Sequence, residues 1–377
     1  MLLVARKNLF SERTRFAISV GGVALSVFLI SLLLSLYRGW DEKVGGFVEE
    51  SDVDIWVGAI GANDFLAAAS IIPLDGLEAL DTHQPIREWA PIIVRPMSGN
   101  VEIKNGEESH GARMDLQLIG YDPATGIGGP LRIVEGTQPP GDGEVIIDAA
   151  LSSRYGLDVG DVISAGGKDW TVVGISEGGD FVAAQTVFVN LKQAQTVLQM
   201  PNQATFIGMR LQDNVDPVKF AADVSLLQPQ AAAFTKEEFA AATRERALGD
   251  VLPILIIVLI LAFVVGLAVA GLTIYTATIE KAREYGILKA VGFKNSYLYR
   301  LVFEQALVTG AIGFVVGIGL TLIFGPLASG YVPQFVTLIR WQDLAAVFAA
   351  TLLMSLVAGY VPVRRLAAID PVSAFKA

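Results

Sequence analysis

The sequence predicts a membrane protein with four transmembrane α-helices, one N-terminal and three C-terminal, and a large α+β extracytoplasmic domain between the first two. Three observations predict this fold class. The mean hydropathy is +0.52 and 53% of the residues are hydrophobic, which is high for a soluble globular protein. The apolar residues lie mainly in four long uncharged stretches. Most acidic residues lie between the first two stretches.

The uncharged stretches cover residues 16–37, 251–279, 306–339 and 344–363 and contain 22, 29, 34 and 20 residues. A helix needs about 20 apolar residues to cross the ~30 Å hydrocarbon core of a bilayer. We therefore expect transmembrane spans at 16–37, 251–277, 304–325 and 342–362. Buried helices of a large soluble protein are the alternative, but such long uncharged stretches rarely occur four times in one.

The short segments that flank the spans are basic and give the orientation. Residues 1–15, 278–300 and 363–377 hold 12 of the 28 lysines and arginines, whereas the loop at 326–341 holds only Arg340. Because basic loops stay on the cytoplasmic side, we expect both termini and the 278–300 segment in the cytoplasm and 326–341 outside. No small-x-small cleavage site follows the first span before Arg38, so we interpret this span as a retained anchor.

Residues 38–250 form the expected outer domain. They hold 32 of the 38 acidic residues and 15 basic ones, a net charge of −17, which argues against nucleic acid as a partner. Apolar runs and turn residues predict strands at 53–57 and 144–148 and a hairpin from 162–164 to 170–173. Helices are expected at 148–155, 190–199, 215–227 and 236–248. The chain has no cysteine, so disulfides and thiol chemistry are excluded.

The sequence contains no catalytic constellation. Gly166–Gly167–Lys168 lacks the upstream glycine and the following Ser or Thr of a nucleotide-binding P-loop. His83 and His110 stand in unrelated polar contexts, where surface histidines are commoner than metal ligands or general bases. An acidic cluster lies just outside the first span, at Glu49, Glu50, Asp52 and Asp54. Its spacing fits no EF-hand loop, so we expect a solvated edge rather than a calcium site. We expect no catalytic residue, no metal and no cofactor in this chain.

The spans are poor in ionisable residues. Glu304 lies at the start of the third span, and no charged residue lies near the middle of any span, which argues against a secondary transporter driven from within this chain. Gly313 and Gly317 give the third span a GxxxG spacing, and Gly266 and Gly271 give the second span a small face. Such faces allow close helix contact, and the sequence leaves open whether they serve dimerisation or packing within one subunit.

The basic segment 278–300 has an amphipathic pattern. Apolar residues recur at roughly helical spacing, at Ile287, Leu288, Val291, Leu298 and Leu301. This predicts one amphipathic helix along the inner membrane face, bounded by Gly292. A snorkelling anchor would explain its cations but not the alternation of acids and bases at Glu280, Lys281, Arg283 and Glu284. As a helix, the preceding uncharged stretch would be about 44 Å long and could transmit force between the outer domain and the inner face.

Three motifs resemble a known family. The residues after the second span follow R-E-x-G-I-x-K-A-x-G, with Arg283, Glu284, Gly286, Ile287, Lys289, Ala290 and Gly292. The C-terminus follows R-R-x-A-x-x-x-P-x-x-A, with Arg364, Arg365, Ala367, Pro371 and Ala374. The N-terminus has Ala5–Arg6–Lys7–Asn8–Leu9 and Gly21–Gly22–Val23–Ala24. With these motifs the chain resembles the FtsX/MacB-like (type VII) permeases of ABC transporters. Arg15–Phe16–Ala17 and Asp54–Ile55–Trp56–Val57 are most similar to the DevC/HrtB branch, which includes glycolipid and haem exporters.

The resemblance implies a permease of the bacterial inner (cytoplasmic) membrane that works as a homodimer with two copies of a separate ABC ATPase subunit. ATP and Mg would be bound by that partner. An elbow at 1–15 and a coupling helix and loop at 278–300 would lie in the cytoplasm. ATP-driven closure would push the second spans together and reshape the outer domains. This mechanotransmission would expel an amphiphilic or hydrophobic substrate, such as a lipid, haem, drug or lipopeptide, and a periplasmic adaptor is a further candidate partner.

The resemblance also suggests two sets of site residues. The expected ATPase contact comprises Glu280, Arg283, Glu284, Gly286, Lys289 and Gly292. The expected substrate groove lies near the outer leaflet at a dimer interface and comprises Phe28, Leu32, Ile257, Leu261 and Val264.

Two other function classes stay open. One is FtsX-like signalling, in which outer-domain motion activates an extracytoplasmic hydrolase without transport, although the outer domain is large for that role. The other is a membrane-anchored enzyme or receptor, which the missing catalytic constellation disfavours. Co-purification of an ATPase separates the first two classes from the third. Stimulation of that ATPase by an amphiphile, rather than by a hydrolase, separates export from signalling.

Overall fold

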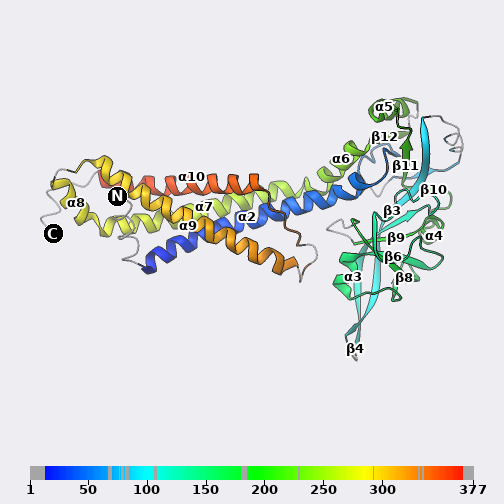
Figure 1. Ribbon diagram of the computed structural model, residues 1–377, viewed down its shortest axis with the longest axis horizontal. Coiled ribbons are helices and arrows are strands. Elements are labelled where there is room, and N and C mark those ends of the chain that lie inside the picture. The colour runs from blue at the N-terminus through cyan, green and yellow to red at the C-terminus, as the bar shows by residue number, and fades with distance from the viewer. Residues whose placement is uncertain are drawn as a thin grey trace. The chain divides into compact units, whose positions relative to one another are not determined.

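The computed structural model describes residues 13–367, except for 67–69, 76, 78–79, 81–84, 106–107, 180–184, 228–229, 292, 330–331 and 333–334. The chain forms two compact units, which we describe separately (Figure 1). The helical unit contains residues up to Gly39 and most residues after Leu252, and the sheet unit contains Trp40–Val251. The predicted fold class is confirmed, with one N-terminal helix, a large α+β domain and three further long apolar helices.

The described part of the helical unit contains the helices α2 (Arg13–Glu50), α7 (Val251–Glu280), α8 (Ala282–Ala290), α9 (Asn295–Ser329) and α10 (Trp341–Ala367). Helices α2, α7, α9 and α10 are each long and apolar enough to cross a membrane. Helix α2 continues beyond the predicted end of the first span at residue 37, and its last turns belong to the sheet unit.

Glycines set the closest contacts in the helical unit. A Cβ atom on Gly313 would lie 2.6 Å from Cγ1 of Val23, and one on Gly317 would lie 2.7 Å from the carbonyl oxygen of Ala24. The GxxxG face of α9 therefore packs against α2 of the same chain, which answers the question that the sequence left open for this face. Gly266 of α7 also packs within the chain, because its Cβ would meet the hydroxyl of Ser26 at 2.5 Å.

The amphipathic helix predicted within 278–300 forms as α8, which ends at Ala290 just before Gly292, but the predicted apolar face included two residues of another helix. Ile287 and Leu288 lie in α8, whereas Leu298 and Leu301 lie in α9. Leu298 and Leu301 are buried in the core of the helical unit, so their spacing continues the apolar stripe of α9. Helical periodicity runs through both segments, and this is why the pattern alone assigned Leu298 and Leu301 to the same apolar face as Ile287 and Leu288.

The sheet unit is built on a ten-stranded mixed sheet with the order β12-β1-β11-β3-β4-β9-β6-β8-β5, and β7 pairs with β3 and β8. The strands are β1 (Ile55–Ala59), β3 (Ile86–Asn105), β4 (Glu108–Tyr121), β5 (Arg132–Gly136), β6 (Glu144–Asp148), β7 (Val162–Ala165), β8 (Lys168–Glu177), β9 (Gln185–Asn190), β11 (Phe206–Leu211) and β12 (Ala231–Thr235). A separate pair joins β2 (Ile72–Pro73) and β10 (Gln203–Ala204). The helices are α3 (Ala149–Tyr155), α4 (Leu191–Val197), α5 (Pro217–Leu227) and α6 (Lys236–Leu248).

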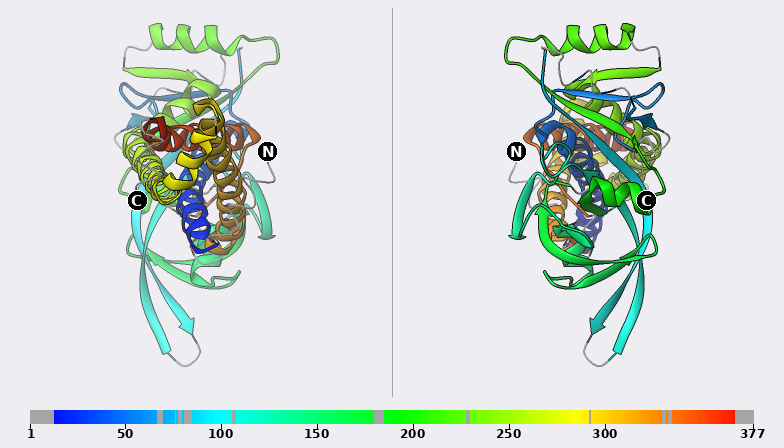
Figure 2. Two further views of the ribbon diagram at one scale, coloured as in Figure 1. Left: turned by 90° about the vertical axis from the view of Figure 1, so that its left-hand side faces the viewer. Right: turned by 90° about the vertical axis from the view of Figure 1, so that its right-hand side faces the viewer.

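Local signals predicted several of these elements correctly. The β7–β8 hairpin closes over Gly166–Gly167, both with positive φ, as expected for a two-residue turn. Helices α3, α4 and α6 begin at side-chain caps, which are Asp148, Asn190 and Thr235. The longest pair, the β3–β4 hairpin, was not predicted, because Pro91 and Pro96 within β3 argue against a strand. Figure 2 shows this hairpin projecting from the rest of the sheet.

An aromatic cluster fills the core of the sheet unit. Trp56 of β1 stacks on Phe239 of α6 with ring centroids 5.3 Å apart, and Phe65 and Phe206 pack against both rings. Phe47, in the last turns of α2, packs against Phe65 at 5.1 Å. The end of α2 and the helix α6 are thus joined to the sheet by one continuous apolar core.

Candidate functional site

Helix α8 is joined to α7 through the single residue Lys281. The backbone N–H of Lys281 donates to the carbonyl oxygen of Ala277 at 3.3 Å, and the N–H of Tyr285 donates to that of Lys281 at 3.0 Å. These bonds keep the spacing of four residues that is typical of an α-helix. The junction is therefore a local distortion of one hydrogen-bonded helix, and α8 lies at the end of the helical unit next to the start of α9 (Figure 1).

One face of α8 is exposed. The exposed residues three or four positions apart are Glu280, Arg283, Glu284, Ile287 and Val291. Tyr285, on another face, is 3% exposed and belongs to the core of the helical unit. The exposed face combines charges of both signs with two aliphatic side chains.

The predicted ATPase-contact residues separate into two groups. Glu280, Arg283 and Glu284 lie on the exposed face, whereas Lys289 is half-buried and Gly286 is buried. Gly292 lies outside the described residues. Ile287 and Val291 were predicted as part of an apolar face on the membrane, but they are exposed on the same side as the charged residues. The sequence contained a signal for this placement. Ile287 follows Arg283 and Glu284 by four and three residues, and Val291 follows them by eight and seven, so helical spacing puts all four on one face.

Arg300 of α9 and Arg364 of α10 lie at nearly the same height along the helical unit. Two close contacts fix the register of α9 against α10, Gly310 with Ser355 and Phe303 with Gly359. The two helices therefore run antiparallel, and Arg300 lies near the level of Arg364, which covers the ring of Tyr360 at 5.8 Å. From Tyr360 to Trp341 is about 29 Å of helix, close to the thickness of the hydrocarbon core, and aromatic residues are typical of both membrane interfaces.

The opposite end of α10 is fastened to α2. Arg38 Nη2 lies 3.1 Å from Asp343 Oδ1, and Arg38 Nε lies 3.2 Å from Asp343 Oδ2. The segment before α10 lies against the same part of α2, because Leu338 N–H donates to the carbonyl oxygen of Ser35 at 2.9 Å. This two-point contact holds α2 and α10 together at the end of the helical unit that carries Trp341.

The predicted groove residues differ in their surroundings. Ile257, Leu261 and Val264 share one exposed face of α7, and Leu261 is 57% exposed. Phe28 and Leu32 are half-buried on α2, and the ring of Phe28 meets that of Phe324 edge-on at 5.7 Å. Phe28 is thus partly engaged inside the bundle, whereas the α7 face is open to lipid or to another chain. Only 11% of the most apolar window of α7 is buried.

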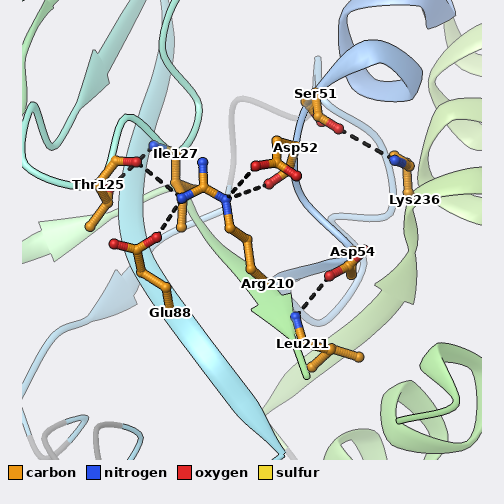
Figure 3. A network of polar contacts seen from close by, with 9 residues as sticks. All are labelled: Ser51, Asp52, Asp54, Glu88, Thr125, Ile127, Arg210, Leu211 and Lys236. Carbon is orange, nitrogen blue, oxygen red and sulfur yellow. Dashed lines mark hydrogen bonds and ion pairs between the residues drawn. The ribbon is translucent and has the colours of Figure 1, made fainter. Parts of the chain in front are cut away.

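In the acidic cluster after the first span, Glu49, Glu50 and Asp52 are exposed as expected, but members of the cluster also make specific polar contacts. Figure 3 shows Arg210 of β11 between three groups. Its Nε donates to the carbonyl oxygen of Asp52 at 2.9 Å, its Nη1 donates to that of Thr125 at 3.1 Å, and it forms ion pairs with Asp52 and Glu88. Asp54 accepts a bond from the backbone N–H of Leu211 at 2.7 Å. These contacts fasten the exit of α2 to two strands and a loop.

Glu49 of the same cluster pairs with Arg244 of α6. The two η nitrogens of Arg244 each lie 2.6 Å from a Glu49 oxygen, and Nε donates to the carbonyl oxygen of Asp41 at 2.9 Å. Since Arg244 is only 24% exposed, this bidentate pair is stronger than a typical surface ion pair.

Across the described residues, no group of three or more His, Cys, Asp or Glu side chains is placed to hold a metal ion. His83 lies outside the described residues, and His110 lies in β4 opposite Ile103.

Two family models match the chain. The MacB-like periplasmic core domain matches residues 16–227, and the FtsX-like permease C-terminal domain matches residues 255–371. The chain belongs to the ABC transporter permeases of the MacB and FtsX type. An uncharacterised ABC transporter permease of Mycobacterium bovis is 26% identical over 100% of this chain and 99% of its own length. The macrolide export ATP-binding/permease protein MacB of Escherichia coli is 23% identical over 98% of this chain and 59% of its own length.

Among solved structures, the periplasmic region of MacB from Actinobacillus actinomycetemcomitans is 11% identical to this chain, with a TM-score of 0.37. The match covers 50% of this chain and 92% of the solved chain. The mycobacterial relative is named as a permease alone, which is consistent with a chain that is not the ATPase, whereas the name of the Escherichia coli relative also includes an ATP-binding function. The comparisons do not separate the DevC/HrtB branch from the rest of the family, so membership of that branch stays a prediction.

Proposed function

We propose that this permease is the membrane subunit of an ATP-driven exporter that works by mechanotransmission. Two copies of a separate ABC ATPase subunit, with ATP and Mg, would act on a homodimer of this chain. The observation that carries the proposal is the exposed face of α8, which is joined to α7 through Lys281 with a backbone hydrogen bond to each helix. Docking of the ATPase on Glu280, Arg283 and Glu284 would let each closure move α8 and α7 together.

The outer domain would receive this motion through the helices that lead into it. Helix α7 begins at Val251, and only two residues separate it from the end of α6 at Leu248. Helix α6 is fastened to the end of α2 by Arg244, and the exit of α2 is fastened to β11 and β3 by Arg210. In this proposal, a push on α7 would pass along the chain to α6, and the contacts of Arg244 and Arg210 would pass it on to the end of α2 and the sheet.

The proposed substrate is an amphiphilic or hydrophobic molecule, such as a lipid, haem, drug or lipopeptide. The exposed face of α7 around Ile257, Leu261 and Val264 would line a groove at the homodimer interface near the outer leaflet, with Phe28 and Leu32 opposite. The macrolide named for the Escherichia coli relative belongs to the drug class in this range. The level shared by Arg300 and Arg364 supports an inner-membrane topology with both termini in the cytoplasm, and a periplasmic adaptor would bind the outer domain.

A signalling role is the second candidate. The match of residues 255–371 to the FtsX-like C-terminal model favours it as the alternative. In that role, the same motion would activate an extracytoplasmic hydrolase and no substrate would be expelled. ATPase activity that responds to a hydrolase but not to any amphiphile would favour signalling over export.

Co-expression with an ABC ATPase encoded beside this chain tests the proposal. Glu284→Lys reverses a charge on the exposed face of α8 and should reduce ATP-dependent export at least tenfold while the protein still folds. Gly286→Trp should have the same effect by displacing α8, since Gly286 is buried. Lys294→Gln is the matched control, because this exposed cation lies beyond α8. Unchanged export and ATPase binding in both α8 variants would contradict the proposed docking face.

A further inference from the structure

A shallow notch lies on α9 near the level of Arg364. It is lined by Tyr297, Arg300, Leu301 and Glu304. Arg300 Nε donates to Glu304 Oε1 at 2.9 Å, and the Arg300 side chain is 69% exposed. Within the described part of the chain, no other side chain or carbonyl group bonds to Arg300, so its η nitrogens are available to a ligand. The notch thus presents an arginine fork and a carboxylate side by side.

An apolar stripe continues from the notch along the same face of α9. Val308, Ala311 and Val315 follow Glu304 at spacings of four, three and four residues, so the four side chains line up on the helix. Ala311 and Val315 are exposed, whereas Val308 is half-buried. A ligand in the notch would meet charges at one end and hydrocarbon side chains over the next three turns.

We propose that the notch binds the head group of an inner-leaflet phospholipid, with the phosphate on Arg300 and a primary ammonium group on Glu304. The planar arginine fork suits phosphate oxygens, and the carboxylate suits an ammonium donor. The notch lies at the level of the interfacial Tyr360 and Arg364, which is the depth of lipid head groups. The stripe from Val308 to Val315 then contacts an acyl chain.

The pair of opposite charges selects among head groups. Phosphoethanolamine carries a phosphate and a primary ammonium a few bonds apart, so it satisfies both Arg300 and Glu304. Phosphoglycerol offers no cation to Glu304, and the ammonium of phosphocholine has no N–H to donate. The proposal rests on insertion of α9 into the membrane and not on docking of an ATPase.

Native mass spectrometry of the full-length chain in detergent, without any ATPase, tests the site. Phosphatidylethanolamine, phosphatidylglycerol and phosphatidylcholine are added separately, and the bound lipid per chain is titrated. We expect one tight phosphatidylethanolamine, and Arg300→Gln should weaken it about tenfold, with Arg300→Lys between the two. Glu304→Gln should remove the preference for phosphatidylethanolamine but keep phosphate binding. Lys294→Gln, which removes a nearby exposed charge outside the notch, should change nothing.

Three results would overturn the proposal. Equal losses in Lys294→Gln and Arg300→Gln would mean diffuse attraction to the basic end of the bundle rather than a site. Tighter binding of phosphatidylglycerol than of phosphatidylethanolamine by the unmodified chain would contradict the ammonium contact at Glu304. Unchanged phosphatidylethanolamine binding by Arg300→Gln would contradict the phosphate contact. Because the lipid titration contains no ATPase, its failure would leave the proposed permease function standing.

Discussion

Arg244 of α6 lies directly over Gly45, a glycine in the interior of α2. A Cβ atom on Gly45 would be 2.3 Å from Arg244 Cζ, which is too close for any real contact. The missing side chain lets Arg244 reach the carbonyl oxygen of Asp41 and both oxygens of Glu49. Glycine inside a helix costs about 1 kcal/mol relative to alanine, and the arginine contact that Gly45 permits explains its presence.

The first prediction uses the neighbouring glycine as its control. Gly45→Ala should lower the free energy of unfolding by about 1–2 kcal/mol, because the new methyl group displaces Arg244 from Glu49. Gly46→Ala should raise it by about 0.5–1 kcal/mol, because a Cβ there meets no atom within 4 Å and alanine favours the helix. Denaturant titration of the full chain in detergent, followed by tryptophan fluorescence, measures both. Similar values for the two variants would contradict the Arg244 contact.

The second prediction concerns the contact between α9 and α2. Gly317→Leu should destabilise the bundle by about 1–3 kcal/mol or more, since a side chain there would run into the backbone of Ala24. Gly319→Leu, two residues away, is the control, because a Cβ at Gly319 has nothing within 4 Å. The thermal aggregation temperature in detergent compares the variants. If Gly319→Leu lowers it as much as Gly317→Leu, the packing of this face within one chain is wrong.

The third prediction tests the proposed homodimer. The chain has no cysteine, so single substitutions report one position each. Leu261→Cys, on the exposed face of α7, should form a cross-linked dimer in membranes on mild oxidation. Ala262→Cys, at a buried neighbouring position, should remain monomeric on a non-reducing gel. Cross-linking at Ala262 and not at Leu261 would place the dimer contact on another face.

The fourth prediction is a pH dependence in the sheet unit. Burial raises the pKa of Tyr121 to about 12 from its usual value near 10. A group whose pKa is higher in the folded state stabilises the fold fully below its unfolded pKa, and this contribution is lost as pH rises from about 10 towards 12. Tyr121→Phe should therefore reduce the loss of stability over this range in alkaline denaturation. Tyr155→Phe, outside this aromatic core, is the control and should unfold like the unmodified chain.

Much of this architecture could be predicted because its signals are local. A run of uncharged residues needs only its own length to indicate a membrane span. A helix start needs only its cap, as at Thr235, whose side chain and that of Glu238 bond reciprocally to the backbone. The charged face of α8 could also be predicted from local sequence, since Glu280, Arg283 and Glu284 lie within one and a half turns of helix.

Contacts between distant segments were decided only by the tertiary structure. Gly45 and Gly46 are the same residue type in the same helix, yet only Gly45 lies under an arginine that is 199 residues away in the chain. From the sequence, the GxxxG face of α9 could pack against a second copy of the chain or within one chain. The structure shows that it packs against Val23 and Ala24 of α2. The physical reason is the distance along the chain over which each effect acts. Propensity, capping and periodicity act between residues a few positions apart. Close packing depends on which distant segment of the chain lies against a given surface.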